Sequence, residues 1–266
     1  LMYPLPSARA GAPAPRAAEA AQLLQDLQAS ACRTRVAAIR SYLVLPGDRL
    51  MSLRQAAGAV EDSLKSRTEL IIQFLEEEAR LHERTRQFAT QFVEARFQYA
   101  RDQDAAKRTA ALERAGWDLL AMVTNPQEPF LMRWSAARYL SYEGARQDHA
   151  DTLSWIPELP KLLGSGDTRS RLIAALLAGR RWLHREQAPE KGVVIPELIQ
   201  GLSGETFQER DESYSVLVAV TERSTESFCV DPTDLPELRA KGIAVWERWW
   251  EANRDALAQE RLPGRW

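Results

Sequence analysis

The sequence predicts an all-α protein, in which a helical N-terminal region is followed by shorter helices that repeat at a regular interval. Three observations lead to this fold class. Apolar residues recur at steps of three and four over long stretches, and runs with the character of a β-strand are short and scarce. The tetrapeptide Ile-Pro-Glu-Leu occurs at residues 156–159 and again at 195–198, which is 39 residues later. With 266 residues, of which 45% are hydrophobic, the chain can bury a substantial core.

Residues 1–16 are predicted to form a disordered arm rich in proline and alanine. The prolines within this stretch exclude a helix, and the segment offers little apolar surface to bury. Ala8-Arg9-Ala10 has the small-x-small form of a signal-peptidase site, so the stub of an export signal is the alternative interpretation.

Residues 17–116 are predicted to form an N-terminal helical region with long helices. Asp48 is placed to cap a second helical stretch, which continues without proline as far as Pro126, with Gly58 and Gly116 as its weak points. An apolar stripe over residues 71–95 alternates by three and four and is interrupted by polar positions. This pattern favours packing against neighbouring helices over a long dimeric coiled coil, and an intermolecular helix pair stays open as the alternative.

Residues 117–266 are predicted to form paired helices that repeat about every 39 residues. Arg133, Arg171 and Arg210 follow one another at steps of 38 and 39. Paired alanines stand at the same offset after the first two of these arginines, at 136–137 and 174–175. Each unit also contains a Gly- or Pro-rich turn between two apolar helical stretches. A period of this length with two helices per unit is typical of an α-solenoid.

These residues give the sequence a resemblance to the HEAT and armadillo-like repeat family. The resemblance covers about residues 117–225 in three units and includes a proline after the first apolar residue of a unit, Pro157 and Pro196. It implies a short HEAT-like α-solenoid. The sequence departs from the family pattern in its acidic residues: Glu128, Asp167 and Glu205 precede the three arginines by five, four and five positions, so a regular Asp–Arg ladder between repeats is not predicted.

The C-terminal stretch after residue 234 is predicted to be one long helix. Asp234 is placed as its N-cap, with Pro236 in the first turn. Trp246, Trp249 and Trp250 form an aromatic stripe on one side. Bacterial HEAT-like proteins often end in a similar Trp-rich helix, and the resemblance implies a buried capping helix. An aromatic partner or ligand site is the alternative.

The sequence contains no residues that identify a reaction. It has no phosphate-binding loop, dinucleotide fingerprint, nucleophile elbow or zinc-protease motif, and its three histidines are widely separated. We therefore predict no catalytic, cofactor-binding or metal-binding residues. Cys32 and Cys229 are expected to be buried free thiols, and a single disulfide between them is the alternative if the protein is exported. No apolar run approaches the roughly 18 residues of a membrane span.

The candidate binding surface lies on the second helices of the repeats, which line one side of a solenoid. We expect a basic patch with two flanking indoles to contact an acidic segment of a protein partner. Its residues are Arg138, Arg169, Arg180, Arg181, Trp134 and Trp182.

The function that follows is a non-enzymatic protein interaction scaffold or an accessory subunit of a larger complex, without cofactors. Two alternatives stay open: a HEAT-like enzyme such as a DNA glycosylase or a lyase, and a subunit of an exported or membrane-associated complex. A nucleic-acid partner is disfavoured because the net charge is −2. A cytoplasmic location is slightly favoured over an exported one.

Overall fold

The computed structural model describes residues 17–43, 48–58, 61–101, 105–144, 154, 157–180 and 189–262. Every regular element within these residues is a helix, which confirms the predicted all-α class. The α-helices are α1 (Ala17–Asp26), α2 (Cys32–Leu43), α3 (Arg49–Ala57), α4 (Asp62–Arg101), α5 (Ala105–Thr124), α6 (Phe130–Gly144), α7 (Glu158–Lys161), α8 (Thr168–Gly179), α9 (Lys191–Gly201), α10 (Phe207–Thr221) and α11 (Pro236–Leu257). Two short 3₁₀ helices are η1 (Leu162–Gly164) and η3 (Glu226–Phe228).

The N-terminal helices begin and end largely where their local signals indicate. The Asp48 carboxylate accepts a hydrogen bond of 2.9 Å from the backbone N–H of Met51, as the predicted N-cap requires. Gly58 ends α3, whereas Gly116 lies inside α5 and does not interrupt it. The predicted boundary at residue 117 therefore falls within a continuous helix.

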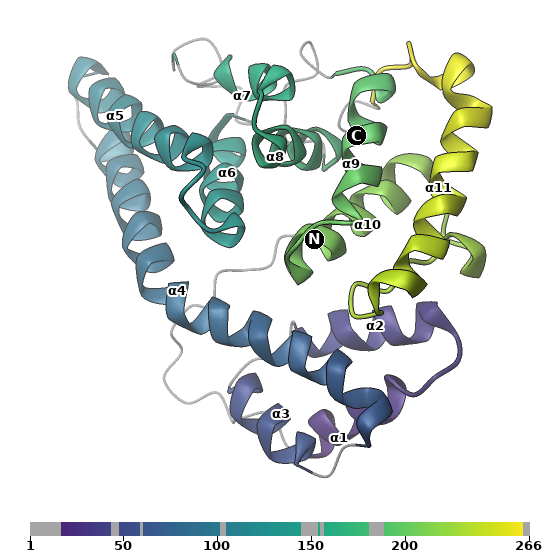
Figure 1. Ribbon diagram of the computed structural model, residues 1–266. Helices are drawn as coiled ribbons and strands as arrows, with labels where there is room; N and C mark the ends of the chain where they lie inside the picture. Colours follow the sequence, from purple (N-terminus) through teal and green to yellow (C-terminus); the bar gives the residue numbers. More distant parts are fainter. Residues whose placement is uncertain are drawn as a thin grey trace.

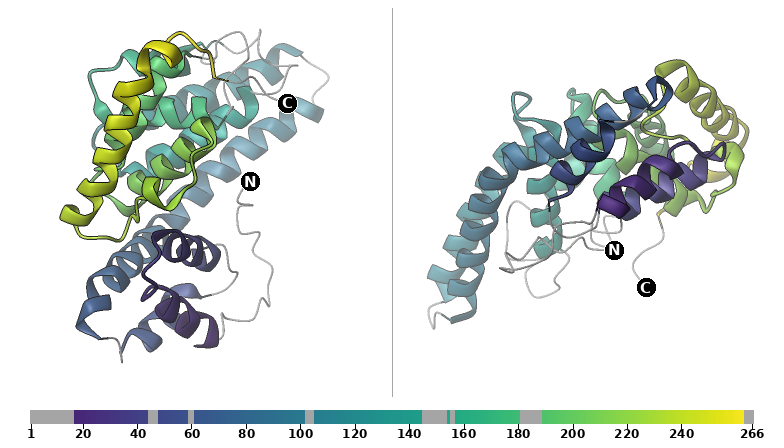
Figure 2. Two further views of the ribbon diagram at one scale, coloured as in Figure 1. Left: turned by 90° about the vertical axis from the view of Figure 1, so that its right-hand side faces the viewer. Right: turned by 90° about the horizontal axis from the view of Figure 1, so that it is seen from below.

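Most helices pack against their neighbours in the sequence (Figure 1), and the later helices α10 and α11 also contact earlier ones. The short helices α1–α3 pack beside the first part of the 40-residue helix α4, and α5 returns along its second part. Helices α6, α8, α9 and α10 come next, and α11 runs along the outer side of α9 (Figure 2). None of the described helices combines the length and the apolar character needed to cross a membrane.

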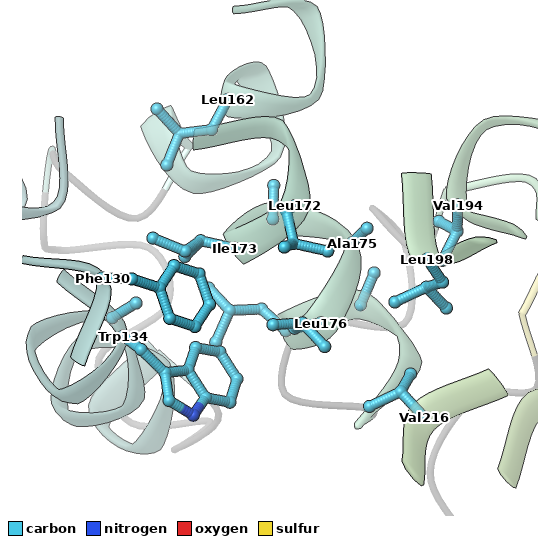
Figure 3. Close-up of a cluster of buried hydrophobic side chains, with 14 of the residues drawn as sticks. Phe130, Trp134, Leu162, Leu172, Ile173, Ala175, Leu176, Val194, Leu198 and Val216 are labelled. Atoms are coloured by element: carbon cyan, nitrogen blue, oxygen red, sulfur yellow. The ribbon is translucent and has the colours of Figure 1, made fainter. Parts of the chain in front are cut away.

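The main hydrophobic core lies between α6, α8, α9 and α10 (Figure 3). Helix α8 stands at its centre, and all of its residues from Leu172 to Gly179 are buried. Its sequence is apolar on every side, which is the pattern of a helix surrounded by other helices. Phe130 and Trp134 of α6 pack toward it from one side and Val194 and Leu198 of α9 from the other.

A second, smaller core holds the N-terminal bundle together; by N-terminal bundle we mean α1, α2, α3 and the first part of α4. It is formed by Ala20, Leu23, Leu27, Ile39, Tyr42, Leu53, Leu64, Ile71, Leu75 and Phe207. All but one of these residues come from the bundle itself. The exception is Phe207, the first residue of α10, whose ring lies 5.2 Å from that of Phe74. The bundle therefore has its own core with a single large apolar contribution from elsewhere.

Helices α8 and α10 repeat each other's local geometry at a distance of 39 residues. Their N-caps are Asp167 and Thr206, and each side chain accepts a backbone N–H from the first turn of its helix. Arg171 and Arg210 occupy equivalent positions. Each donates to the carbonyl oxygen six residues earlier, at 3.0 Å to Ser165 and 2.8 Å to Gly204.

Arg133, the third arginine of the predicted series, forms a different bond that links successive helix pairs. Its side chain is fully buried and donates to the carboxylate of Asp167, to Ser170 Oγ at 2.7 Å and to the Val123 carbonyl at 2.8 Å. The acidic partner thus comes from the following unit, 34 residues later, and not from the residues just before the arginine. This is why the spacing of acidic residues ahead of each arginine gave no sign of the bond.

The two Ile-Pro-Glu-Leu segments take different places in their helices. Pro157 is the N-cap of the single-turn helix α7, whereas Pro196 lies inside α9, which already begins at Lys191. The earlier start has a local cause. The backbone N–H groups of Lys191 and Gly192 donate to the carbonyls of Glu260 and Ala258, so the segment after α11 holds the first turn of α9.

The Trp-rich helix α11 is anchored by its indoles. Trp246 is fully buried and donates from Nε1 to the Phe228 carbonyl at 2.8 Å. Trp249 and Trp250 are partly buried and pack against the main core. The predicted burial is thus confirmed for Trp246, whereas the other two indoles of the stripe are only partly buried. The N-cap, however, is Leu235 and not Asp234, because the Asp234 carboxylate is used in ion pairs with distant arginines.

Candidate functional site

The predicted basic patch is brought together in part. Trp134 and Arg138 lie on α6, Arg169 begins α8, and Arg180 is the C-cap residue of α8. Arg138 is partly buried. Arg181 and Trp182 lie outside the described residues. Among the described members of the patch, Trp134 and Arg180 meet, whereas Arg169 lies at the opposite end of α8 from Arg180.

Trp134 and Arg180 meet at a buried carboxylate that the sequence did not single out. The Trp134 indole is 1% exposed and donates from Nε1 to Glu212 Oε1 at 3.1 Å. The Arg180 guanidinium pairs with the other oxygen of Glu212 and lies 5.9 Å from the centre of the Trp134 ring. Gln208 adds a third donor at 3.3 Å. The side chains of Trp134 and Arg180 therefore point toward α10 and bind Glu212 of the same chain.

Arg169 bridges α8 and α10. Its Nε donates to Glu209 and its Nη2 to Glu205, both at 2.7 Å. Burial alone would lower the pKa of Arg169, but the hydrogen bonds and charges of the two glutamates outweigh it and raise the pKa. Glu209 is almost fully buried, whereas the Glu205 side chain is 86% exposed. The outer of the two carboxylates is therefore solvated.

A second polar contact on α10 faces the N-terminal bundle. Arg40 of α2 donates from Nε to Asp211 Oδ1 at 2.9 Å and from Nη2 to the Asp211 carbonyl at 3.1 Å. The same guanidinium lies 5.4 Å from the centre of the Tyr214 ring. Burial raises the pKa of the Asp211 carboxyl, and the charge of Arg40 only partly offsets this effect.

The largest polar cluster lies in the segment 231–234, with the sequence Asp-Pro-Thr-Asp, which we call the DPTD loop. The loop is buried and receives hydrogen bonds from one arginine on each of four helices. The donors are Arg35 of α2, Arg67 of α4, Arg210 of α10 and Arg239 of α11. Of these four residues the sequence singled out Asp234 alone, as the N-cap of the last helix.

Two of these arginines neutralise the carboxylates of the DPTD loop. Arg35 Nε lies 2.6 Å from Asp231 Oδ2, and its Nη2 lies 3.2 Å from Asp234 Oδ2. Arg67 pairs with the other oxygen of Asp234. Burial is nevertheless the largest effect on Asp234 and, with the neighbouring charge of Asp231, raises its pKa.

A disulfide joins Cys32, the first residue of α2, to Cys229, just before the DPTD loop. The expectation of two free thiols is therefore wrong. Folding brings the two Cα atoms to 6.0 Å although they are separated by 197 residues. Beside the disulfide, the backbone N–H groups of Cys32 and Arg33 both donate to the carboxylate of Glu226.

Among the described residues, no group of three or more His, Cys, Asp or Glu side chains is arranged to hold a metal ion. A shallow depression between α3 and α4 is lined by Leu50, Arg54, Glu76, Ala79 and Arg80, and two of these residues pair with each other. The ionisable clusters described above instead connect one helix to another. They hold the architecture in place.

Comparison of the chain with models of protein families, with curated proteins and with solved structures finds no match.

Proposed function

We propose that this protein is a non-enzymatic interaction scaffold or an accessory subunit, built from HEAT-like helix pairs and closed by the Trp-rich helix α11. The observation that carries the proposal is the 39-residue repetition of the N-caps Asp167 and Thr206 together with Arg171 and Arg210. Stacked helix pairs of this kind present extended side-chain surfaces to partners. The assignment of function rests on that architecture.

The partner surface that we propose is centred on Arg169, with Arg138 of α6 as the second charged residue to be tested. Arg169 binds one buried and one exposed carboxylate, and the exposed one, on Glu205, contributes little to stability because it is solvated. An acidic segment of a partner can take the place of Glu205 on the same guanidinium, with Glu209 holding the side chain in position. Trp134 and Arg180 then serve as the internal support of this surface.

The test is recovery of a partner by crosslinking from the native source, with single variants as bait. Arg169→Gln and Arg138→Glu are expected to reduce recovery of the specific partner at least roughly fivefold, in line with loss of a charged contact. Arg254→Glu on the outer face of α11 is the control, because Arg254 is exposed and pairs only with carboxylates close in sequence. Circular dichroism and melting temperature establish that each bait is folded. Equal recovery by all three variants and the wild type contradicts the proposed surface.

The disulfide favours a second element of the proposal, namely that the complex lies in an oxidising compartment. Disulfides persist in exported proteins and are rare in reducing compartments. Trapping of free thiols during lysis of the native source tests this: an oxidised Cys32–Cys229 pair in the exported fraction is the expected result. A protein that is found fully reduced in the cytosolic fraction contradicts it.

A further inference from the structure

The N-terminal bundle is held against the other end of the chain by contacts of one consistent polarity. All the cations in these ion pairs come from α2 and α4, namely Arg35, Arg40 and Arg67. All the anions lie between residues 211 and 234. The disulfide lies among these pairs. We call the disulfide and the ion pairs together the clasp; Figure 1 shows α2 lying next to α10 and α11, where the clasp forms.

Apolar contact across this junction is limited. The bundle buries its side chains in its own core, to which only Phe207 is added from α10. In the opposite direction, α2 contributes Val36 to the main core, with Cys32 packed against it. The bundle thus has the means to stay folded when it is separated from α10, because α4 keeps it covalently attached and its core residues are mainly its own.

The ion pairs alone are a weak hold. Separation of a buried pair returns both charges to water, and the hydration they regain offsets much of the lost attraction. The Cys32–Cys229 disulfide keeps the paired groups close together, at a high effective concentration. Each ion pair then re-forms readily after it opens. The state of the Cys32–Cys229 bond therefore decides whether the remaining contacts of the clasp stay closed.

We propose that the clasp is a redox-controlled switch, in which cleavage of the Cys32–Cys229 disulfide releases the N-terminal bundle from α10 and the DPTD loop. The reductant is a dithiol, either a small molecule or a dithiol oxidoreductase. Its thiolate attacks Cys32 Sγ, the S–S bond breaks, and Cys229 leaves as a thiolate. The second thiol of the reductant then displaces Cys32. The reductant ends as a disulfide, two electrons pass to the protein, and both cysteines end as thiols.

The surroundings of the two sulfurs favour this direction of attack. Cys32 is partly exposed, whereas Cys229 is 8% exposed. The Glu226 carboxylate accepts hydrogen bonds from the backbone N–H groups of Cys32 and Arg33 and is a further contact between α2 and the segment that carries Cys229.

Hydrogen exchange measured by mass spectrometry on the full chain tests the switch, with and without dithiothreitol. The reduced protein and the Cys32→Ser/Cys229→Ser variant are both expected to exchange faster in residues 32–43 and 226–234, by on the order of tenfold or more, while α8 stays unchanged. Arg40→Gln with the disulfide intact is the matched control. It removes an ion pair of the clasp and is expected to exchange like the oxidised wild type.

Three outcomes overturn the proposal. The first is equal exchange in the oxidised and reduced proteins. The second is faster exchange throughout the molecule, including α8, because the disulfide then supports the whole fold and does not control one junction. The third is an Arg40→Gln protein that opens as far as the reduced one with its disulfide intact, since the ion pairs would then decide the state of the clasp.

Discussion

Helix α10 takes part in two junctions that differ in what holds them together. Toward α8 the helices touch: a methyl group added to Gly179 would come within 2.1 Å of Val216 Cγ1, and both residues lie in the main core. Toward α2 the contact is made by a long side chain, with Arg40 reaching Asp211 and the ring of Tyr214. The junction with α8 combines apolar burial with the ion pairs of Arg169 and Arg180, whereas the junction with α2 is made mainly by charge and a disulfide.

The two junctions therefore respond to different perturbations. Apolar burial is lost through cavities and overpacking and is insensitive to pH and reductants. A junction of ion pairs is sensitive to the charge state of each partner, and the disulfide within it to redox conditions. Substitutions on either side of α10 can therefore test apolar burial and the ion pairs separately.

The largest effect is expected from Trp134→Ala, which removes a large apolar side chain from the main hydrophobic core. The change leaves a cavity beside α8 and removes a hydrogen bond from Glu212, and we expect a loss of about 4 kcal/mol in the free energy of unfolding. Urea denaturation measures it. Trp117→Ala is the control, because Trp117 is 43% exposed and should lose less than about 1 kcal/mol. Similar losses at both positions would show that burial in this core is not what stabilises it.

Asp231→Asn removes the buried carboxylate that pairs with Arg35 in the clasp. The Asp231 side chain is 0% exposed, and the substitution leaves the Arg35 guanidinium buried with one carboxylate fewer, at an expected cost of about 3 kcal/mol. A double-mutant cycle with Arg35→Met checks the assignment. The double variant should be clearly more stable than the sum of the single losses implies. Strict additivity would mean that the two side chains do not interact as described.

Gly179→Ala tests how closely α8 and α10 approach. The added methyl group must displace Val216, and we expect a loss of about 2 kcal/mol. Gly166→Ala is the matched control because an added Cβ there meets no atom within 4 Å. Thermal unfolding of the two variants gives the comparison. A Gly179→Ala protein as stable as the control would show that the helices lie farther apart.

The smallest effects are expected in the pH dependence of stability. The contributions of Asp167 and Asp211 to the free energy of unfolding change with pH in opposite directions. Burial opposes ionisation of Asp167, but hydrogen bonds from Arg133 and Ser170 prevail and lower its pKa. Its contribution to stability is therefore present above pH 3.8 and is lost as the pH falls through the lowered value. For Asp211 burial raises the pKa, so the folded state favours the protonated form. Its contribution is present below pH 3.8 and is lost as the pH rises through the raised value.

Urea midpoints between about pH 3 and 7 show these slopes. Asp167→Asn should remove part of the loss of stability on acidification, and Asp211→Asn should remove part of the loss as the pH rises above 3.8. If both substitutions change the profile in the same direction, the assignment of one of the two carboxylates is wrong.

The parts of this fold that could be predicted are those encoded by neighbouring residues. The all-helical class, the cap at Asp48 and the burial of Trp246 all follow from patterns within one or two helical turns. The 39-residue step between Arg171 and Arg210 was visible because both residues bind the turn just before their own helix.

The parts that could not be predicted depend on residues that are far apart in the sequence. Asp234 has the position of an N-cap, but arginines 199 and 167 residues away compete for its carboxylate and win. The sequence does contain a charge pattern that agrees with the disulfide. Arg35 stands three residues after Cys32 and Asp231 two residues after Cys229, so the two cysteines are flanked by complementary charges. The inward orientation of Arg180 could not be seen without Glu212 beside it.

Peptide mapping without reduction shows whether the N-terminal bundle is closed on residues 226–234. The protein is alkylated under native conditions, digested and analysed by mass spectrometry. The structure predicts a linked pair of peptides that contains Cys32 and Cys229, with neither cysteine alkylated, and separation of the pair on reduction. Two alkylated cysteines and no linked pair would contradict it.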